Sequence, residues 1–142
     1  MKDKKGKFEF IEHTADIKFQ AFGSSIEESF ENAGLAMFNI MFSGKVKGKL
    51  KKSIKVKGKD NESLLYNFLE ELLFLLDTKD FFISSCRVKI KDSKKGKELW
   101  AELFGDSVKN YETNIDVKAV TYNDMFVRQE GKKWICQVVV DV

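Results

Sequence analysis

Alternating apolar and polar residues form the first clear pattern in the chain, which runs from Phe8 to Gly23. Such alternation is typical of strands that bury one face. The pattern breaks at residues 12–16, where the only histidine, His13, stands close to Asp16. We therefore expect two strands joined by a polar bend. This bend either carries function or is a turn in which Thr14 and Asp16 accept local hydrogen bonds from backbone N–H groups.

Two later segments carry apolar residues at the three- and four-residue spacing of amphipathic helices. The first helix is expected over residues 25–42, because Ser25 and Glu28 can form a capping box at its start. The second helix is expected over residues 61–77, where Asp60 can cap a segment with a wide face of leucines.

Strand patterns fill most of the remaining chain. They are expected over residues 50–58, 84–91, 99–104, 116–127 and 134–142. With the opening strands and the two helices, the element order is ββαβαββββ. This order predicts an α+β fold, in which a mixed or antiparallel β-sheet carries two amphipathic helices. We expect residues 1–7 to be a disordered basic tail and residues 8–142 to form a single domain.

Composition narrows the classes of protein that fit this pattern. A chain of 142 residues with 43% hydrophobic residues can bury one core. It contains neither an apolar run of ~20 residues, which a membrane span needs, nor the apolar segment of a secretion signal. Cys86 and Cys136 lie in strand patterns without metal-ligand or redox spacing. We therefore expect a cytoplasmic protein, not associated with a membrane, with two free and buried thiols.

Several common catalytic signatures are missing from the sequence. It has no glycine-rich phosphate loop and no serine in a nucleophile-elbow motif. A single histidine cannot make a histidine-rich zinc site. We therefore expect no independent enzyme activity. A metal-dependent hydrolase is the weaker alternative, because only His13 could supply a base beside a set of metal ligands.

A basic stretch from Lys45 to Lys59 contains eight lysines and accounts for much of the net charge of +3. Such a stretch can bind nucleic acid, or it can protect an exposed strand edge from pairing with another strand. No aromatic residue lies between these lysines, so no surface for base stacking is visible. The exposed strand edge is therefore the favoured interpretation.

A second polar anomaly lies at the far end of the chain. The nearly continuous apolar run from Trp134 to Val140 is typical of a buried strand, and it is followed by Asp141 and Val142. If Asp16 lies beside this end, three carboxylates converge, and a cation would relieve their repulsion. Ligands that are all oxygen favour hard ions such as Ca²⁺ or Mg²⁺. The alternative is an exposed aspartate without function, and the spacing alone does not decide between the two.

Three short segments stand out in the chain: EHTADI at residues 12–17, KAVTY at residues 118–122 and VVDV at residues 139–142. In this order they resemble the three signatures of the archease family. The start of the first expected helix at residues 24–38 and that of the second at residues 62–65 are also similar to that family. The resemblance thus covers essentially the whole chain from Phe8.

The resemblance implies an accessory protein of RtcB-type RNA ligases, which join RNA ends in tRNA splicing. Such a protein is not an enzyme. It promotes guanylylation of the ligase, so that the ligase turns over many times, and it meets tRNA or other RNA only indirectly. The resemblance also implies a divalent cation, Ca²⁺ first, with Mg²⁺ and Mn²⁺ as alternatives. The implied ligands are Asp16, Asp141 and the carboxylate of Val142.

Two further residues of these signatures are implied as neighbours of the site. His13 stands where the family motif has its histidine. Lys118 either contacts the ligase or its nucleotide, or is a strand lysine that pairs with a carboxylate.

Two positions depart from the family motifs. Lys18 stands where the family usually has glycine, and its side chain would lie close to the acidic site unless it points away. Asn123 stands where the family usually has histidine, so a role that needs an imidazole is in doubt, although asparagine can still donate a hydrogen bond. The alternative function is a chaperone-like or RNA-binding module that uses the stretch from Lys45 to Lys59.

Overall fold

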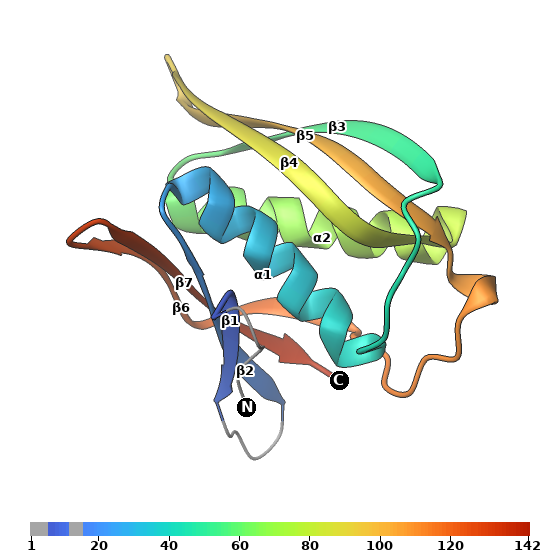
Figure 1. Ribbon diagram of the computed structural model, residues 1–142. Coiled ribbons are helices and arrows are strands. Elements are labelled where there is room, and N and C mark those ends of the chain that lie inside the picture. The colour runs from blue at the N-terminus through green and yellow to red at the C-terminus, as the bar shows by residue number, and fades with distance from the viewer. Residues whose placement is uncertain (1–5, 12–15) are drawn as a thin grey trace.

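The computed structural model describes residues 6–11 and 16–142, and their secondary structure follows the expected order (Figure 1). The elements are β1 (Phe8–Ile11), β2 (Ile17–Gly23), α1 (Ile26–Met41), β3 (Leu50–Gly58), α2 (Asn61–Lys79), β4 (Phe81–Ser93), β5 (Gly96–Ser107), the short 3-10 helix η1 (Val108–Asn110), β6 (Ala119–Glu130) and β7 (Lys133–Asp141). The expected α+β class and the order ββαβαββββ are confirmed.

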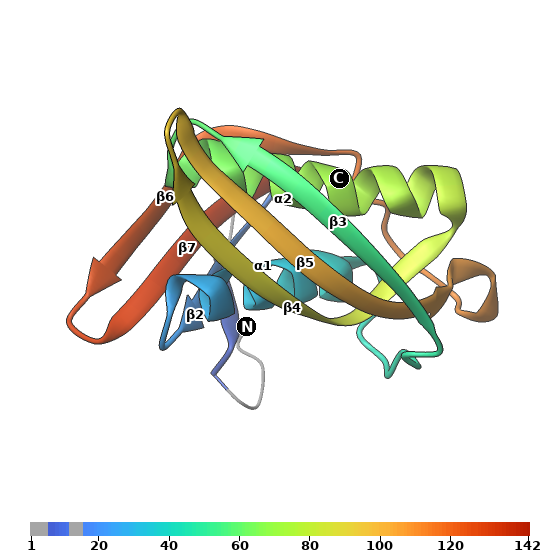
Figure 2. The same cartoon turned by 90° about the horizontal axis from the view of Figure 1, so that it is seen from above.

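The strands of the described residues form two antiparallel sheets, where the sequence pattern predicted one. One sheet has the order β1-β2-β7-β6 and the other has the order β3-β5-β4. The helices α1 and α2 lie side by side between the two sheets (Figures 1 and 2). Helix α1 contacts β2 and β7 of one sheet and β4 of the other, so the molecule has three layers with the helices in the middle.

The middle layer explains why helix α1 is buried on nearly all sides. Large residues fill the space toward both neighbours of the helix: Phe38 packs against Phe82 of β4, and Phe30 stacks on Phe68 of α2. A Cβ atom at Gly34 would lie only 3.1 Å from Cδ1 of Leu72 on α2, so a glycine at this position permits the close contact between the helices. Helix α2 buries its predicted leucine face in the same core.

Both predicted helix starts are capped by the expected residues. The hydroxyl of Ser25 accepts a hydrogen bond from the N–H of Glu28 at 3.1 Å. The Glu28 carboxylate, however, accepts from the N–H of Ser24 at 2.7 Å, one residue before the position that a capping box would use. At α2, Asp60 accepts from the N–H of Ser63 at 2.8 Å, and the Ser63 hydroxyl in turn accepts from the N–H of Asp60. These bonds satisfy N–H groups that lack partners within the helix.

Glutamates on the two helices accept hydrogen bonds from the edge strands β4 and β6. The pairs of glutamate carboxylate and backbone N–H are Glu31 with Val88, Glu62 with Val127, and Glu70 with Val120, at 2.8, 3.0 and 2.9 Å. Edge strands present N–H groups that no further strand satisfies, and these bonds satisfy some of them from the helix layer. Burial raises the pKa of Glu31, which is the cost of placing this carboxyl between a helix and a strand.

The lysine-rich strand β3 lies at the outer edge of its sheet, as the favoured interpretation predicted. Its burial alternates, so that Lys51, Lys55 and Lys57 face solvent while Ile54 and Val56 face the core. Two of the lysines pair with glutamates of β5: Lys51 with Glu102 at 2.7 Å and Lys55 with Glu98 at 3.5 Å. Much of this stretch therefore serves as a charged strand edge.

The two cysteines are free and buried, as expected. Burial raises the pKa of each thiol to about 12, so neither is a thiolate at neutral pH. None of the helices in the described part of the chain is long and apolar enough to span a membrane. The basic tail predicted over residues 1–7 lies mostly outside the described residues, and within it the carbonyl of Lys7 accepts a hydrogen bond from the N–H of Phe22 at 2.8 Å.

Candidate functional site

Strand register brings two of the expected ligand residues to the same end of neighbouring strands. Ile17 is the partner of Val140 across β2 and β7. Asp16 directly precedes Ile17, and Asp141 directly follows Val140. In an antiparallel pair these two steps lead in the same direction, so Asp16 and Asp141 occupy facing positions along the two backbones. Asp16 is half-buried, whereas Asp141 is exposed.

The start of strand β6 joins this end of the sheet from the other side of β7. Ala119 is the partner of Asp141, and the N–H of Lys118 donates to the Asp141 carbonyl at 2.8 Å. Residues from all three motif segments therefore meet where β2 begins and β7 ends, and we call Asp16, Asp141 and Val142 the acidic corner. Val142 is 37% exposed. The exposed Lys118 lines an open pocket of about 550 Å³ beside the corner, together with acidic residues such as Asp80 and Asp116.

The acidic corner offers only oxygen donors. Across residues 6–11 and 16–142, no group of three or more His, Cys, Asp or Glu side chains is placed to hold a metal ion. The expected ligand set has only two such side chains, Asp16 and Asp141, and its third member is a main-chain carboxylate at Val142. Two carboxylate side chains at facing positions fit a hard cation such as Ca²⁺, which completes its shell with main-chain oxygens and water. His13 lies outside the described residues, as do the other residues of 12–15.

Lys18, the first departure from the family motifs, is directed toward strand β6. Its Nζ lies 3.1 Å from Oδ2 of Asp124, and its side chain is only 18% exposed. Asp124 has a φ of 54° and lies in the interval between Thr121 and Phe126 where the pairing of β6 with β7 is interrupted. The positive charge of Lys18 is thus paired with a carboxylate outside the acidic corner.

Asn123, the second departure, lies in the same interruption of β6. Its side chain is exposed, and its N–H donates to the Thr121 hydroxyl at 3.3 Å. The neighbouring carbonyl of Asp124 accepts from the Gln137 side chain at 2.7 Å. These bonds, with the ion pair of Lys18, hold a bulge that carries the chain away from β7.

The sequence pattern gave no role to one stripe of helix α2. Glu62, Tyr66 and Glu70 follow one another at four-residue spacing, so they share one face of the helix. The two glutamates hold β6 through backbone N–H groups, and Tyr66 stacks on Tyr122 with ring centroids 4.2 Å apart and an angle of 9° between the planes. A polar and aromatic stripe within an apolar helix was the signal that could have revealed this contact with β6.

The fold and the corner together define a class of small α+β proteins, in which two antiparallel sheets enclose two helices and strand ends bring carboxylates together. Residues 8–142 match the model of the Archease protein family (MTH1598/TM1083), and the chain belongs to this family.

Relatives named "Protein archease" support this assignment over nearly the full chain. The protein of Pyrococcus abyssi is 39% identical over 140 residues, which cover 96% of this chain and 99% of the relative. That of Methanosarcina barkeri is also 39% identical over 140 residues, with 96% of each chain covered. The sequence resemblance on which the archease expectation rested is thus confirmed at the level of the family.

Two solved structures have the same fold. The solution structure of protein 1598 from Methanobacterium thermoautotrophicum is 37% identical and superposes with a TM-score of 0.82, covering 96% of this chain and 99% of that one. The crystal structure of a Thermotoga maritima protein, described as an archease and possible chaperone, is 22% identical with a TM-score of 0.64, covering 93% and 94% of the two chains. The second likeness concerns the fold alone.

Proposed function

We propose that this chain is a non-enzymatic, metal-binding activator of an RtcB-type RNA ligase in the cytoplasm. It promotes guanylylation of the ligase and thereby multiple turnover in tRNA splicing. The observation that carries the proposal is the meeting of the motif segments at one end of a sheet, where Asp16 and Asp141 take facing positions. Membership of the archease family supports it.

The acidic corner would hold the cation through Asp16, Asp141 and the carboxylate of Val142. A bound Ca²⁺ ion supplies a positive charge that the oxygen atoms of two molecules can share. The chain's own contribution is to orient its carboxylates at the end of a sheet that is anchored in the core. Lys118 is exposed beside this corner, in a position to contact a partner.

The chemistry of ligation is assigned to the partner. Cys86 and Cys136 are buried with a pKa of about 12 each, so neither thiol is available as a nucleophile. Burial of both thiols also suits a reducing compartment, in agreement with a place of action in the cytoplasm.

The alternative of an RNA-binding or chaperone-like module rests on the stretch from Lys45 to Lys59. Lys51 and Lys55 pair with glutamates of β5, so the middle of this stretch has less charge to offer a partner. The description "possible chaperone" belongs to the Thermotoga maritima protein, whose similarity at 22% identity extends to the fold. The activator is therefore the better supported function.

The test of the activator is ligase turnover. A cognate RtcB-type ligase is mixed with GTP and an excess of RNA ends, with and without this protein, and product is counted per ligase molecule. The protein should convert a single-turnover reaction into a multiple-turnover reaction. Asp16→Ala and Asp141→Ala should each lose most of this gain.

The matched control is Glu112→Ala, which removes an exposed carboxylate from the loop before β6. It should stimulate the ligase as the unaltered protein does, and circular dichroism should show that all three variants are folded. Full stimulation by both aspartate variants would assign their carboxylates a structural role. Unchanged turnover with the unaltered protein would refute the activator.

A further inference from the structure

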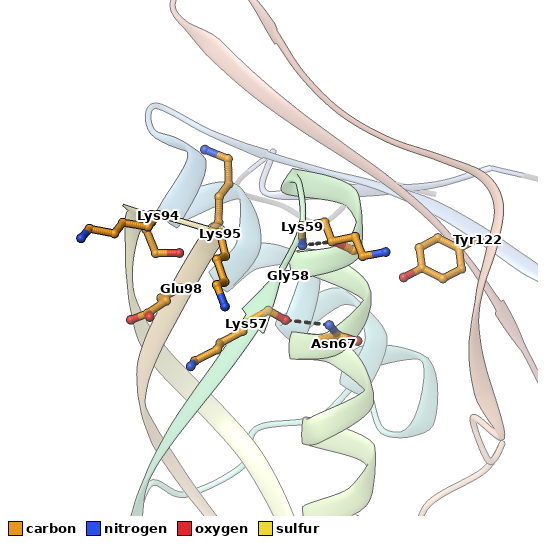
Figure 3. Close-up of a pocket in the computed structure, with 11 residues that line it drawn as sticks. Lys57, Gly58, Lys59, Asn67, Lys94, Lys95, Glu98 and Tyr122 are labelled. Carbon is orange, nitrogen blue, oxygen red and sulfur yellow. Dashed lines mark hydrogen bonds between the residues drawn. The ribbon is translucent and has the colours of Figure 1, made fainter.

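A second charged region lies away from the acidic corner, where β3 ends, α2 begins and the turn between β4 and β5 comes close. These segments enclose an open pocket of about 680 Å³, lined by five lysines, one glutamate and Tyr122 among other residues (Figure 3). Lys57 and Lys59 come from the end of β3, and Lys94 and Lys95 come from the β4–β5 turn. We call these four lysines and Tyr122 the basic pocket.

Two glycines hold the segments of the basic pocket in direct backbone contact. A Cβ atom at Gly96 would lie 2.4 Å from the carbonyl oxygen of Gly58, which is far closer than two such atoms can approach. A Cβ atom at Gly58 would lie 2.5 Å from the backbone nitrogen of Leu64 in α2. The turn, the strand end and the helix start are therefore packed on one another at their backbones, and the lysines they carry have fixed attachment points.

Side chains of α2 strengthen this arrangement. Asn67 donates to the carbonyl of Lys57 at 2.7 Å, and the N–H of Lys59 donates to the Ser63 hydroxyl at 2.8 Å (dashed in Figure 3). Two lysine-bearing residues of β3 are thus bonded to the helix through their backbones. Their side chains remain available for a ligand.

The positive charge of the basic pocket is largely uncompensated. Within the described part of the chain, no carboxylate oxygen lies within 4 Å of the side-chain nitrogen of any of the four lysines, Lys57, Lys59, Lys94 and Lys95. Three acidic residues nearby are engaged elsewhere. Asp92 pairs with Lys97, the fifth lysine of the lining, at 2.6 Å. Glu98 pairs with Lys55 at 3.5 Å, and the Asp60 carboxylate accepts from the N–H of Ser63. Lysines gathered in this way repel one another, and an anion that binds among them relieves the repulsion.

Tyr122 adds an aromatic ring to the edge of the basic pocket. Tyr122 is 54% exposed and stacks on Tyr66 of α2, which holds its ring in place. In Figure 3 the Lys59 side chain extends in the direction of Tyr122, while Lys57 and Lys94 lie on the other side of the pocket. An exposed ring beside a cluster of positive charges is the combination that binds single-stranded nucleic acids, because bases stack while phosphates pair with lysines.

We propose that the basic pocket binds a single-stranded polynucleotide, with backbone phosphates on Lys57, Lys59, Lys94 and Lys95 and one base on Tyr122. An acidic peptide would satisfy the lysines but would leave the exposed ring without a role, so a polynucleotide fits the pocket better. This site shares no residue with the acidic corner. The proposal is independent of the proposed ligase activation, since binding at this pocket requires neither the cation nor the ligase.

The test measures binding of a fluorescein-labelled RNA of ten uridines to the full chain by fluorescence anisotropy, at several salt concentrations. Lys94→Ala/Lys95→Ala should weaken binding by about tenfold or more. This variant should also reduce the slope of log K against log salt by about 1.4, which is what two lost phosphate contacts to a single strand predict. Both positions are exposed in a turn, so the variant should fold as the unaltered protein does.

Tyr122→Ala separates stacking from charge. It should weaken binding by roughly tenfold without changing the salt slope, because a stacked base carries no counterion release. Tyr122→Phe keeps the ring and should bind within about twofold of the unaltered protein. Circular dichroism confirms that both variants are folded.

The matched control is Lys45→Ala/Lys47→Ala, which removes two exposed lysines from the other end of the basic stretch. It should bind the RNA within about twofold of the unaltered protein. Equal losses for the two lysine variants would refute a defined pocket in favour of diffuse attraction. Competition by a peptide of ten glutamates, or by inorganic triphosphate, as strong as that by unlabelled RNA would assign the pocket to acidic proteins or small anions and overturn the proposal.

Discussion

Strand β6 and the residue before it contribute to both the acidic corner and the basic pocket, yet the two regions are built in different ways. Lys118, just before β6, bonds to Asp141 at the corner, and Tyr122 on β6 lines the pocket. Four residues of extended strand separate them, a span of roughly 13 Å. The corner gathers its charge through strand register, whereas the pocket gathers its charge through two turns whose backbones touch at Gly58 and Gly96.

This difference shows how one small fold can carry a negative region and a positive region without either neutralising the other. Strand register places the carboxylates of Asp16 and Asp141 at one sheet end, and Lys18 beside them is already paired with Asp124. The turns place four lysines where the nearby carboxylates of Glu98 and Asp60 have other partners. Each region therefore keeps its charge, and the ligands we propose are a cation for the corner and an anion for the pocket.

The largest effect is expected at the acidic corner. Asp16→Asn/Asp141→Asn removes two negative charges while keeping the side-chain size, and it should weaken Ca²⁺ binding by at least about 100-fold, because carboxylate number sets affinity for this ion. Isothermal titration calorimetry of the purified protein measures the change. Binding that persists within tenfold of the unaltered protein would place the ion elsewhere.

The control for this prediction comes from the basic pocket. Lys94→Ala/Lys95→Ala should leave Ca²⁺ affinity within about twofold, since the two lysines belong to the other sheet and salt limits the reach of their charges to a Debye length of roughly 8–10 Å. A variant at either region that changed the affinities for Ca²⁺ and for RNA alike would show that the two regions are one coupled site, and the comparison would fail.

Local features of the fold could be predicted from the sequence because their causes are local. Strand β3 was expected over residues 50–58 and spans Leu50–Gly58, since alternating lysines and apolar residues mark both its faces. The split into two sheets could not be predicted. Helix α1 buries even Ser29 and Asn32. The Asn32 side chain donates to the carbonyl of Phe22 at 2.6 Å, a contact that depends on the packing of β2 against the helix.

The two charged regions also differ in how far the sequence could predict them. The resemblance to a family singled out Asp16 and Asp141, and the ladder of β2 and β7 sets them at facing positions. Lys94 and Lys95 lie between two strand patterns, and nothing in a linear pattern shows that the turn they form packs against Gly58, thirty-six positions earlier. Contacts between turns depend on the completed fold, so sequence patterns do not reveal them.

The second prediction compares the two hairpin turns. Gly96→Ala should destabilise the protein by about 2–4 kcal/mol, because φ is +144° there and a Cβ atom would collide with the carbonyl of Gly58. Gly131→Ala in the β6–β7 turn should cost only about 1 kcal/mol, since its φ is +62° and no atom lies within 4 Å of the added Cβ. Urea unfolding followed by circular dichroism measures both, and equal costs would show that the turn at the basic pocket is not locked.

The third prediction concerns the carboxylate of Val142. Extending the chain beyond Val142 by a short Gly-Ser tag turns this carboxylate into an amide carbonyl and removes one negative charge from the corner. Ca²⁺ affinity should fall by roughly tenfold, less than for the two aspartates together, because a carbonyl oxygen can still coordinate the ion. The same tag placed at the N-terminus is the control. Equal affinities for the two tagged proteins would remove Val142 from the ligand set.

The smallest effect is expected for Lys18, and it tests whether the ion pair isolates the corner from this charge. Lys18→Met keeps the apolar stem and removes a positive charge about 7 Å along the strand from Asp16. At that distance in water, one charge changes the interaction with a doubly charged ion by about 1.2 kcal/mol. Salt at about 0.15 M screens this to about 0.5 kcal/mol, so Ca²⁺ affinity should rise by roughly two- to threefold. Because Asp124 loses its partner in the variant, its own charge adds to this rise. The gain should disappear near 1 M salt, where the Debye length is only about 3 Å.

The control is Lys132→Met in the distant β6–β7 turn, which should leave Ca²⁺ affinity unchanged. A gain of tenfold or more, or one that resists salt, would mean that Lys18 competes directly with the cation for Asp16, in spite of its 3.1 Å contact with Asp124.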